Sequence, residues 1–167
     1  MSKLSSPRPR APKGSQHFSI VASQFNADYV QGLIDHALAE LRALNPKAKI
    51  DILRVPGAFE IPIVVRELAS NKNGDAIIAI GVILKGETDH AKNLSHSVTA
   101  ALQQVAVEHR VPVINAVLSF DDEAQARARC LENKINRGTE AARAAIEIAN
   151  TMSTLRRRSG QALRKKK

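Results

Sequence analysis

Aromatic residues are scarce in this 167-residue sequence, which contains no tryptophan, one tyrosine and four phenylalanines. Proteins that bind single-stranded nucleic acid stack its bases on several aromatic side chains, so the composition disfavours that class. The single cysteine, Cys130, excludes an intrachain disulfide and a multi-cysteine zinc site, and it fits a reducing compartment. No apolar run approaches the roughly 20 residues of a membrane-spanning helix, and the basic N-terminus lacks the apolar stretch of a secretory signal. We therefore expect a soluble, cytoplasmic protein that does not associate with a membrane.

Positive charge is concentrated at the two ends of the chain. The formal net charge is +9, yet residues 1–16 and 156–167 carry 11 of the 25 basic residues and no acidic residue. Their Pro, Ser, Lys and Arg content without apolar periodicity predicts two disordered basic tails that flank one domain at residues 17–155. Such tails often only increase solubility; the alternative is a weak, salt-dependent attraction to nucleic acid.

Within the domain, the spacing of apolar residues alternates between the strand and the helix pattern. Strands are predicted at 18–23, 50–55, 76–84 and 111–118, and helices at 27–44, 60–70, 94–105, 122–132 and 139–152. Strands that alternate with helices indicate a parallel sheet joined by right-handed crossovers. We predict an α/β, flavodoxin-like three-layer sandwich, with a four-stranded parallel sheet and helices on both faces.

Ligands of such sheets bind beyond the carboxyl ends of the strands, so the segments there are the candidates for a site. GETDH at 86–90 follows a buried strand and opens a helix. The free N–H groups of a helix start and the Thr88 hydroxyl suit a phosphate, but the segment taken alone favours ordinary helix capping by Thr88 or Asp89. His90 suits proton transfer near neutral pH; the alternative is a surface histidine without a role.

Three further side chains have two interpretations each. Phe25 either stacks on a ring or covers the core. Glu60, in a turn between two prolines, either accepts hydrogen bonds from hydroxyl groups or only favours the start of a helix. Arg129 either holds a phosphate with two hydrogen bonds or solvates a helix.

Six motifs occur together in this chain: SQFN at 23–26, VPGAFEIP at 55–62, GVILKGETDH at 81–90, PVI at 112–114, NRG at 136–138 and AIEIAN at 145–150. In order and spacing, from about residue 17 to 152, they resemble the lumazine synthase family. The resemblance implies condensation of 5-amino-6-(D-ribitylamino)uracil with 3,4-dihydroxy-2-butanone 4-phosphate. The products are 6,7-dimethyl-8-ribityllumazine, phosphate and water, and the reaction needs no metal or organic cofactor.

The resemblance also implies roles for individual residues. His90 is expected to move protons, Phe25 to stack on the pyrimidine, and Glu60 to bind ribityl hydroxyls. Phosphate is expected at Glu87, Thr88 and Arg129. The other expected substrate contacts are Asn26, Ala58, Phe59, Val82, Ile83, Leu84 and Asn115, with Val82, Ile83 and Leu84 using backbone groups.

By the same resemblance, the family assembles as pentamers with active sites between adjacent subunits, so Asn115 and Arg129 would serve the neighbour's site. The absence of an insertion at 132–138 favours a closed icosahedral capsid, and riboflavin synthase is a candidate partner. Asn115, Asn133 and Ala91 depart from the family's usual residues. Two alternatives stay open: a non-catalytic paralogue that binds flavin or phosphate, and a polyanion-binding scaffold that acts through basic tails.

Overall fold

Four parallel strands form the middle layer of the fold. The computed structural model describes residues 7–11, 14–71 and 74–164. The strands are β1 (His17–Ser23), β2 (Lys49–Val55), β3 (Ala76–Leu84) and β4 (Val113–Phe120), in the spatial order β2-β1-β3-β4. β3 is buried along nearly its whole length, as its uninterrupted apolar run AIIAIGVIL predicts for a central strand of a parallel sheet.

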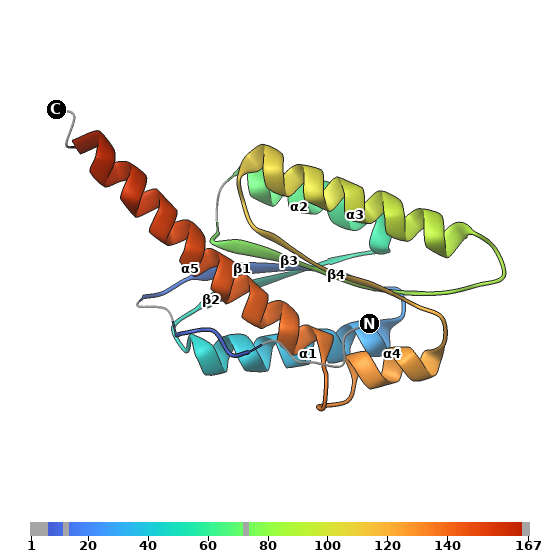
Figure 1. The fold of residues 1–167 in the computed structure, drawn as a ribbon. Helices are drawn as coiled ribbons and strands as arrows, with labels where there is room; N and C mark the ends of the chain where they lie inside the picture. The colour runs from blue at the N-terminus through green and yellow to red at the C-terminus, as the bar shows by residue number, and fades with distance from the viewer. Residues whose placement is uncertain (1–6, 12–13, 72–73, 165–167) are drawn as a thin grey trace.

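Helices cover both faces of this sheet, and each face has its own apolar core (Figure 1). One face carries α1 (Ala27–Leu44), α4 (Glu123–Cys130) and α5 (Arg137–Arg164); the other carries α2 (Ile61–Ser70) and α3 (His90–His109). A short 3-10 turn, η1 (Ala58–Glu60), precedes α2. The arrangement confirms the predicted α/β sandwich with its four-stranded parallel sheet.

The motif NRG at 136–138 joins α4 to α5. Buried Asn136 donates from Nδ2 to the carbonyl oxygen of Cys130 at 2.9 Å, and its Oδ1 accepts the N–H of Gly138 at 2.8 Å. Asn136 therefore caps the start of α5 and ties it to the end of α4. Gly138 lies directly against the backbone of α1, where a Cβ would stand 2.1 Å from the carbonyl oxygen of Leu33.

At the C-terminal end, the structure differs from the predicted helix and tail. α5 continues to Arg164, so residues 156–164 form helix where the composition predicted a disordered tail. A helix that is already packed extends without a new nucleation step, and the basic residues near its C-terminus favour the helix dipole. Residues 165–167 lie outside the described part of the chain.

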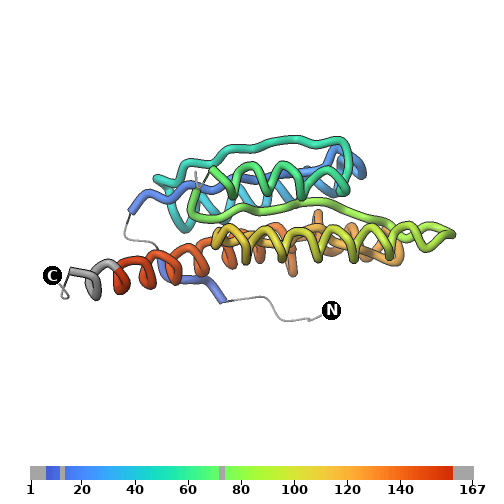
Figure 2. Tube along the Cα trace, turned by 90° about the horizontal axis from the view of Figure 1, so that it is seen from above, coloured from blue at the N-terminus to red at the C-terminus, as the bar shows by residue number. Residues whose placement is uncertain are grey.

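The N-terminal segment, residues 7–11 and 14–16, packs on the domain. Glu40 binds Arg8 through two hydrogen bonds of 3.0 Å and Arg143 at 2.8 Å. Asn150 donates to the carbonyl oxygen of Arg10 at 3.2 Å. Part of the predicted N-terminal tail is thus held against α1 and α5, while residues 1–6 and 12–13 lie outside the described residues. Figure 2 shows this segment running alongside α5.

Candidate active site

A cleft of about 430 Å³ lies at the carboxyl ends of the strands. Nine of the predicted site residues line it: Phe25, Asn26, Ala58, Phe59, Val82, Ile83, Leu84, Thr88 and His90. Gly57, Gly86, Ala91 and Leu94 complete the lining. Three segments that are far apart in the sequence, at 25–26, 57–59 and 82–94, therefore meet at one edge of the sheet, as the parallel topology requires.

A larger hollow of about 570 Å³ lies between α2 and α3. It shares only Phe59 with the cleft, and its charged side chains, Arg66 and Glu108, approach each other to 3.9 Å. It contains none of the predicted phosphate-binding or proton-transfer groups. We therefore assign the candidate site to the cleft.

The turn after β1 holds Phe25 at the mouth of the cleft. Asn26 has φ 56° and ψ 48°, a left-handed conformation that asparagine adopts more readily than most residues. The N–H of Phe25 donates to the carbonyl oxygen of Pro56 at 3.2 Å, which joins this turn to the turn after β2. The Phe25 side chain is 72% exposed, so its ring is free to stack on a ligand instead of covering the core.

β3 extends beyond β1 where it reaches the cleft. β1 pairs with β3 only as far as Ile80, whereas β4 pairs with β3 as far as Leu84. One backbone edge of residues 81–84 is therefore not covered by β1. Asn26 fills part of this gap, because its Nδ2 donates to the carbonyl oxygen of Val82 at 2.7 Å. The remaining edge offers N–H and C=O groups to the polar rim of a heterocycle.

The turn between Pro56 and Pro62 orients Glu60. The N–H of Gly57 donates to Oε2 of Glu60 at 2.9 Å, which fixes the carboxylate within its own turn. Oε1 has no hydrogen-bond partner in the described part of the chain, so it is available to a hydroxyl group. Glu60 itself is not among the residues that line the cleft, whereas its neighbours Ala58 and Phe59 are.

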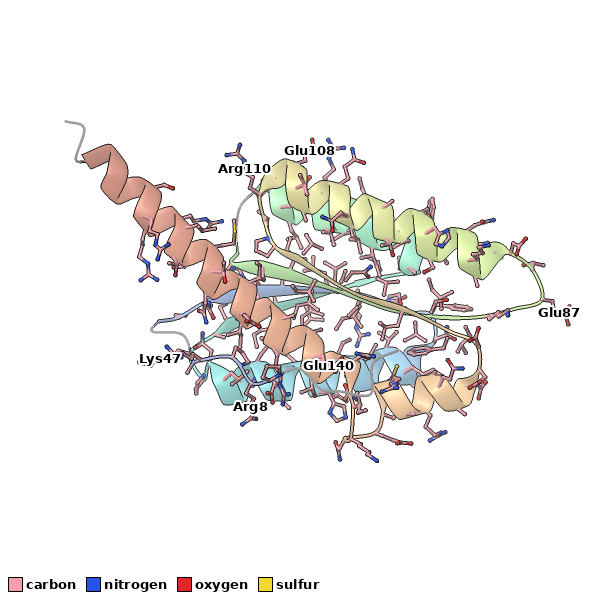
Figure 3. All side chains as sticks on the ribbon, in the orientation of Figure 1. Arg8, Lys47, Glu87, Glu108, Arg110 and Glu140 are labelled. Atoms are coloured by element: carbon pink, nitrogen blue, oxygen red, sulfur yellow. The ribbon has the colours of Figure 1, made fainter. Side chains whose placement is uncertain are left out.

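The loop between β3 and α3 closes the other side of the cleft. Thr88 and His90 line the cleft, and Oγ1 of Thr88 accepts a long hydrogen bond, 3.4 Å, from the N–H of His90. Asp89 occupies the capping position of α3 but forms no side-chain capping bond. The first turn of α3 thus keeps N–H groups for an anion. Figure 3 shows Glu87 at the outer tip of this loop, and Glu87 is not among the residues that line the cleft.

Asn115 and Arg129 lie away from the cleft within one chain. Asn115 is exposed on β4, where its Nδ2 donates to Oγ1 of Thr99 at 3.1 Å and its Oδ1 accepts the N–H of Val117 at 3.0 Å. Arg129 is half-buried on α4 and has no ion pair among the described residues. Among the described residues, no lysine or arginine lines the cleft. One chain therefore supplies the helix start for an anion but not the guanidinium.

Of the four cleft-lining residues that were not predicted as site residues, Leu94 has the largest side chain. Its helical spacing with Val98, Leu102 and Val105 indicates the core. The signal that could have placed it is its position four residues after His90, which puts both side chains on one face of α3. Ala91, a departure from the usual family residue, lines the cleft and is also 7% exposed, so a larger side chain would have to displace its neighbours.

Two other features of the described residues bear on the chemistry. Burial raises the pKa of the Cys130 thiol to about 12, so this side chain stays protonated and packs in the core. The described residues hold no group of three or more His, Cys, Asp or Glu side chains arranged for a metal ion. Within the same residues, no helix has the length and apolar character needed to cross a membrane.

Comparison with known proteins decides the family. The family profile described as 6,7-dimethyl-8-ribityllumazine synthase matches residues 15–153. The chain belongs to the 6,7-dimethyl-8-ribityllumazine synthase family. A lumazine synthase of Leptothrix cholodnii is 43% identical over 138 residues, which cover 82% of this chain and 87% of the relative. The lumazine synthase of Nitrosomonas europaea is 42% identical, over 81% of this chain and 81% of the relative. The lumazine synthase of Chromobacterium violaceum is 38% identical, over 82% of this chain and 86% of the relative.

Membership of the lumazine synthase family confirms the resemblance that the six motifs indicate. The matched residues include every segment that lines the cleft. The comparisons do not favour the non-catalytic paralogue or the polyanion-binding scaffold as the main function. The basic residues beyond 153 lie outside the match, so the family does not account for them.

Proposed function

We propose that the cleft condenses 5-amino-6-(D-ribitylamino)uracil with 3,4-dihydroxy-2-butanone 4-phosphate to form 6,7-dimethyl-8-ribityllumazine, phosphate and water. Family membership makes the chain a transferase of riboflavin biosynthesis. The observation that carries the proposal for this site is the convergence of an exposed ring, an uncovered strand edge, a helix start and a histidine on one cleft. These groups match an aromatic heterocycle and a phosphate held side by side.

Phe25 and the edge of β3 bind the pyrimidine. The exposed Phe25 ring stacks on its face, while backbone groups of Ile83 and Leu84 pair with its polar rim. Asn26 holds these two elements together through its bond to Val82. Glu60 accepts hydrogen bonds from the ribityl hydroxyls with its free Oε1, and Ala58 and Phe59 border the ribityl chain.

The start of α3 binds the phosphate through the N–H groups near Glu87 and Thr88. Because no lysine or arginine of the described residues lines the cleft, a second subunit supplies the guanidinium of Arg129. Arg129 forms no ion pair with the described residues of its own chain, which supports this assignment, since a half-buried cation gains from an anionic partner. Asn115, exposed on β4, faces the neighbouring site in the same assembly.

His90 transfers protons during the reaction. The amine attacks the ketone, and the carbinolamine loses water to give an imine. Phosphate then departs, and the enol that remains becomes a second ketone. The second amine attacks this ketone, and a second water leaves as the ring closes. Each step moves a proton near neutral pH, which suits an imidazole. His90 is exposed in the single chain, so water is able to replace part of its role. Holding both substrates in register supplies much of the remaining acceleration.

We extend the proposal to a pentamer with active sites between adjacent subunits, and to a closed icosahedral capsid. Riboflavin synthase, which would use the product, is the proposed protein partner, and the cytoplasm is the proposed location. The weak attraction of nucleic acid to the basic ends stays a prediction. The domain boundaries at 17 and 155 also stay predictions, with Ala149 as the last core residue of α5.

The test of this function is product formation, followed by lumazine absorbance after both substrates are mixed with the protein. Wild type accelerates formation above the uncatalysed background. Replacing His90 with asparagine lowers kcat by about 100-fold, which is the low end of the range for loss of a general acid–base group. The loss is this small because water reaches the exposed site and replaces part of the proton transfer. The KM values of this variant change little, since the stacking and phosphate contacts remain. A loss of substrate binding without a loss of kcat in His90→Asn would contradict this role.

A further inference from the structure

The last turns of α5 leave the domain. Ala149 is 2% exposed and ends the buried face of the helix, whereas every residue from 154 to 159 is exposed. Figure 1 shows this end of α5 extending past the edge of the sheet. With a rise of about 1.5 Å per residue, residues 154–164 span about 16 Å. The side chains of residues 154–159 therefore contribute nothing to the core of the domain.

This projecting part of the helix carries unneutralised positive charge. Arg156, Arg157 and Arg158 are all exposed, and no acidic residue follows Glu147 in the sequence. No carboxylate of the described residues forms an ion pair with these three arginines. Consecutive residues point about 100° apart on a helix, so the three guanidinium groups cover more than half of its circumference. A polyanion that approaches this part of α5 therefore comes close to a guanidinium group from most directions.

The N-terminal segment adds a cation to the same surface. Arg10 is exposed, and the bond from Asn150 to its carbonyl oxygen holds its backbone beside α5. A hollow of about 530 Å³ separates the segment from the helix, with Arg10 and Arg157 among its lining residues. The one carboxylate in that lining, Asp75, already accepts the N–H of His17 at 2.9 Å. Ser15, Ser153 and Thr154 add side-chain hydroxyls to the lining.

We propose that this basic surface, defined as Arg10 and Arg156–Arg158, binds the phosphate backbone of RNA without sequence preference. Arginine pairs with phosphate through two hydrogen bonds, and the surface lacks the aromatic side chains that would read or stack bases. An anionic membrane fits less well, because Leu155 is the only large apolar residue among 154–159. The surface lies at the amino ends of β1 and β3, opposite the cleft, so bound RNA leaves the active site open.

The test uses the full-length assembled protein and a fluorescently labelled 20-nucleotide uridine RNA, with anisotropy measured from 50 to 200 mM salt. Variant R156Q/R157Q/R158Q removes three cations and keeps helix propensity, since glutamine and arginine are similar helix formers. The matched control, R42Q/R54Q/R66Q, removes three exposed arginines from α1, β2 and α2. Circular dichroism and lumazine formation check that both variants are folded and active.

We expect the α5 variant to bind the RNA about tenfold more weakly at 50 mM salt, with the slope of log Kd against log salt reduced by about 2. The control keeps wild-type affinity within about twofold. If both variants lost RNA affinity equally, net charge alone would explain the effect, and the proposal would be overturned. Unchanged affinity in the α5 variant would overturn it as well. Binding to phosphatidylserine vesicles without binding to the RNA would assign the surface to membranes instead.

Discussion

Replacing Gly138 with alanine forces apart two helices that support the site. The added Cβ would lie 2.1 Å from the carbonyl oxygen, 2.9 Å from the carbonyl carbon and 3.0 Å from the Cα of Leu33. A carbon–oxygen contact needs about 3.3 Å, so the new atom is about 1.2 Å too close. All three atoms belong to the backbone of α1, so no side-chain rotation relieves the contact. α5 must instead move away from α1.

The expected cost follows from this displacement. Overpacking of a core costs about 1–3 kcal/mol, and a backbone obstacle places Gly138→Ala at the upper end. The gain in helix propensity, at most about 1 kcal/mol, offsets part of it. We expect a net loss of about 2 kcal/mol in the free energy of unfolding. For a chain of this size, that lowers Tm by about 4–8 °C.

The assay is thermal unfolding followed by circular dichroism, with Gly14→Ala as the matched control. A Cβ on Gly14 would meet no atom within 4 Å, so the same substitution there should change the free energy of unfolding by less than about 0.5 kcal/mol. Equal melting temperatures for Gly138→Ala and wild type would refute the close approach of α1 and α5. Equal losses in both variants would assign the effect to glycine itself rather than to this contact.

Two further changes test contacts near the cleft and at the N-terminal segment. Asn26→Asp keeps the tolerance for a left-handed backbone but removes the donor to the carbonyl oxygen of Val82. We expect the free energy of unfolding, measured with urea, to fall by about 1–3 kcal/mol and the KM for the pyrimidine substrate to rise. An unchanged free energy of unfolding and an unchanged KM would show that the hydrogen bond does not hold the turn. Hydrogen bonds from Arg8 and then Arg143 keep the pKa of Glu40 below its usual value, against the opposing effect of burial. Glu40 therefore stabilises the fold above its unfolded-state pKa, and this contribution is lost as pH falls through the folded-state pKa. Between about pH 5 and 3, the free energy of unfolding should fall more steeply in wild type than in Glu40→Gln, and parallel curves would contradict the ion pair.

The sheet is the part of the fold that the sequence predicts best. β3 has the predicted bounds, because a central parallel strand needs an uninterrupted apolar run that few other elements have. β4 begins two residues later than predicted, at Val113, since Pro112 has no N–H to offer to the ladder. The helical continuation of α5 was missed because arginine-rich turns show no apolar periodicity, although they extend a packed helix readily.

The candidate site is predictable where its residues follow strands. The topology alone brings the segments of Phe25, Ala58 and His90 to one edge, because parallel strands end together. Arg129 and Asn115 lie on α4 and in the middle of β4, where no rule about strand ends applies. Their expected roles rest on the motif resemblance, and the single chain keeps them away from the cleft.

The most direct test of a shared active site is complementation between two inactive variants. Arg129→Ala removes the proposed guanidinium, and Thr88→Arg blocks the phosphate end of the cleft with a bulky side chain. Each variant alone should form lumazine at a small fraction of the wild-type rate. When the two variants are co-assembled in equal amounts, some sites combine a wild-type cleft from one subunit with a wild-type Arg129 from its neighbour. If the subunits mix randomly, about a quarter of the sites have this combination, so about a quarter of the wild-type activity should return. Activity that stays at the level of the separate variants would contradict a site built from two subunits.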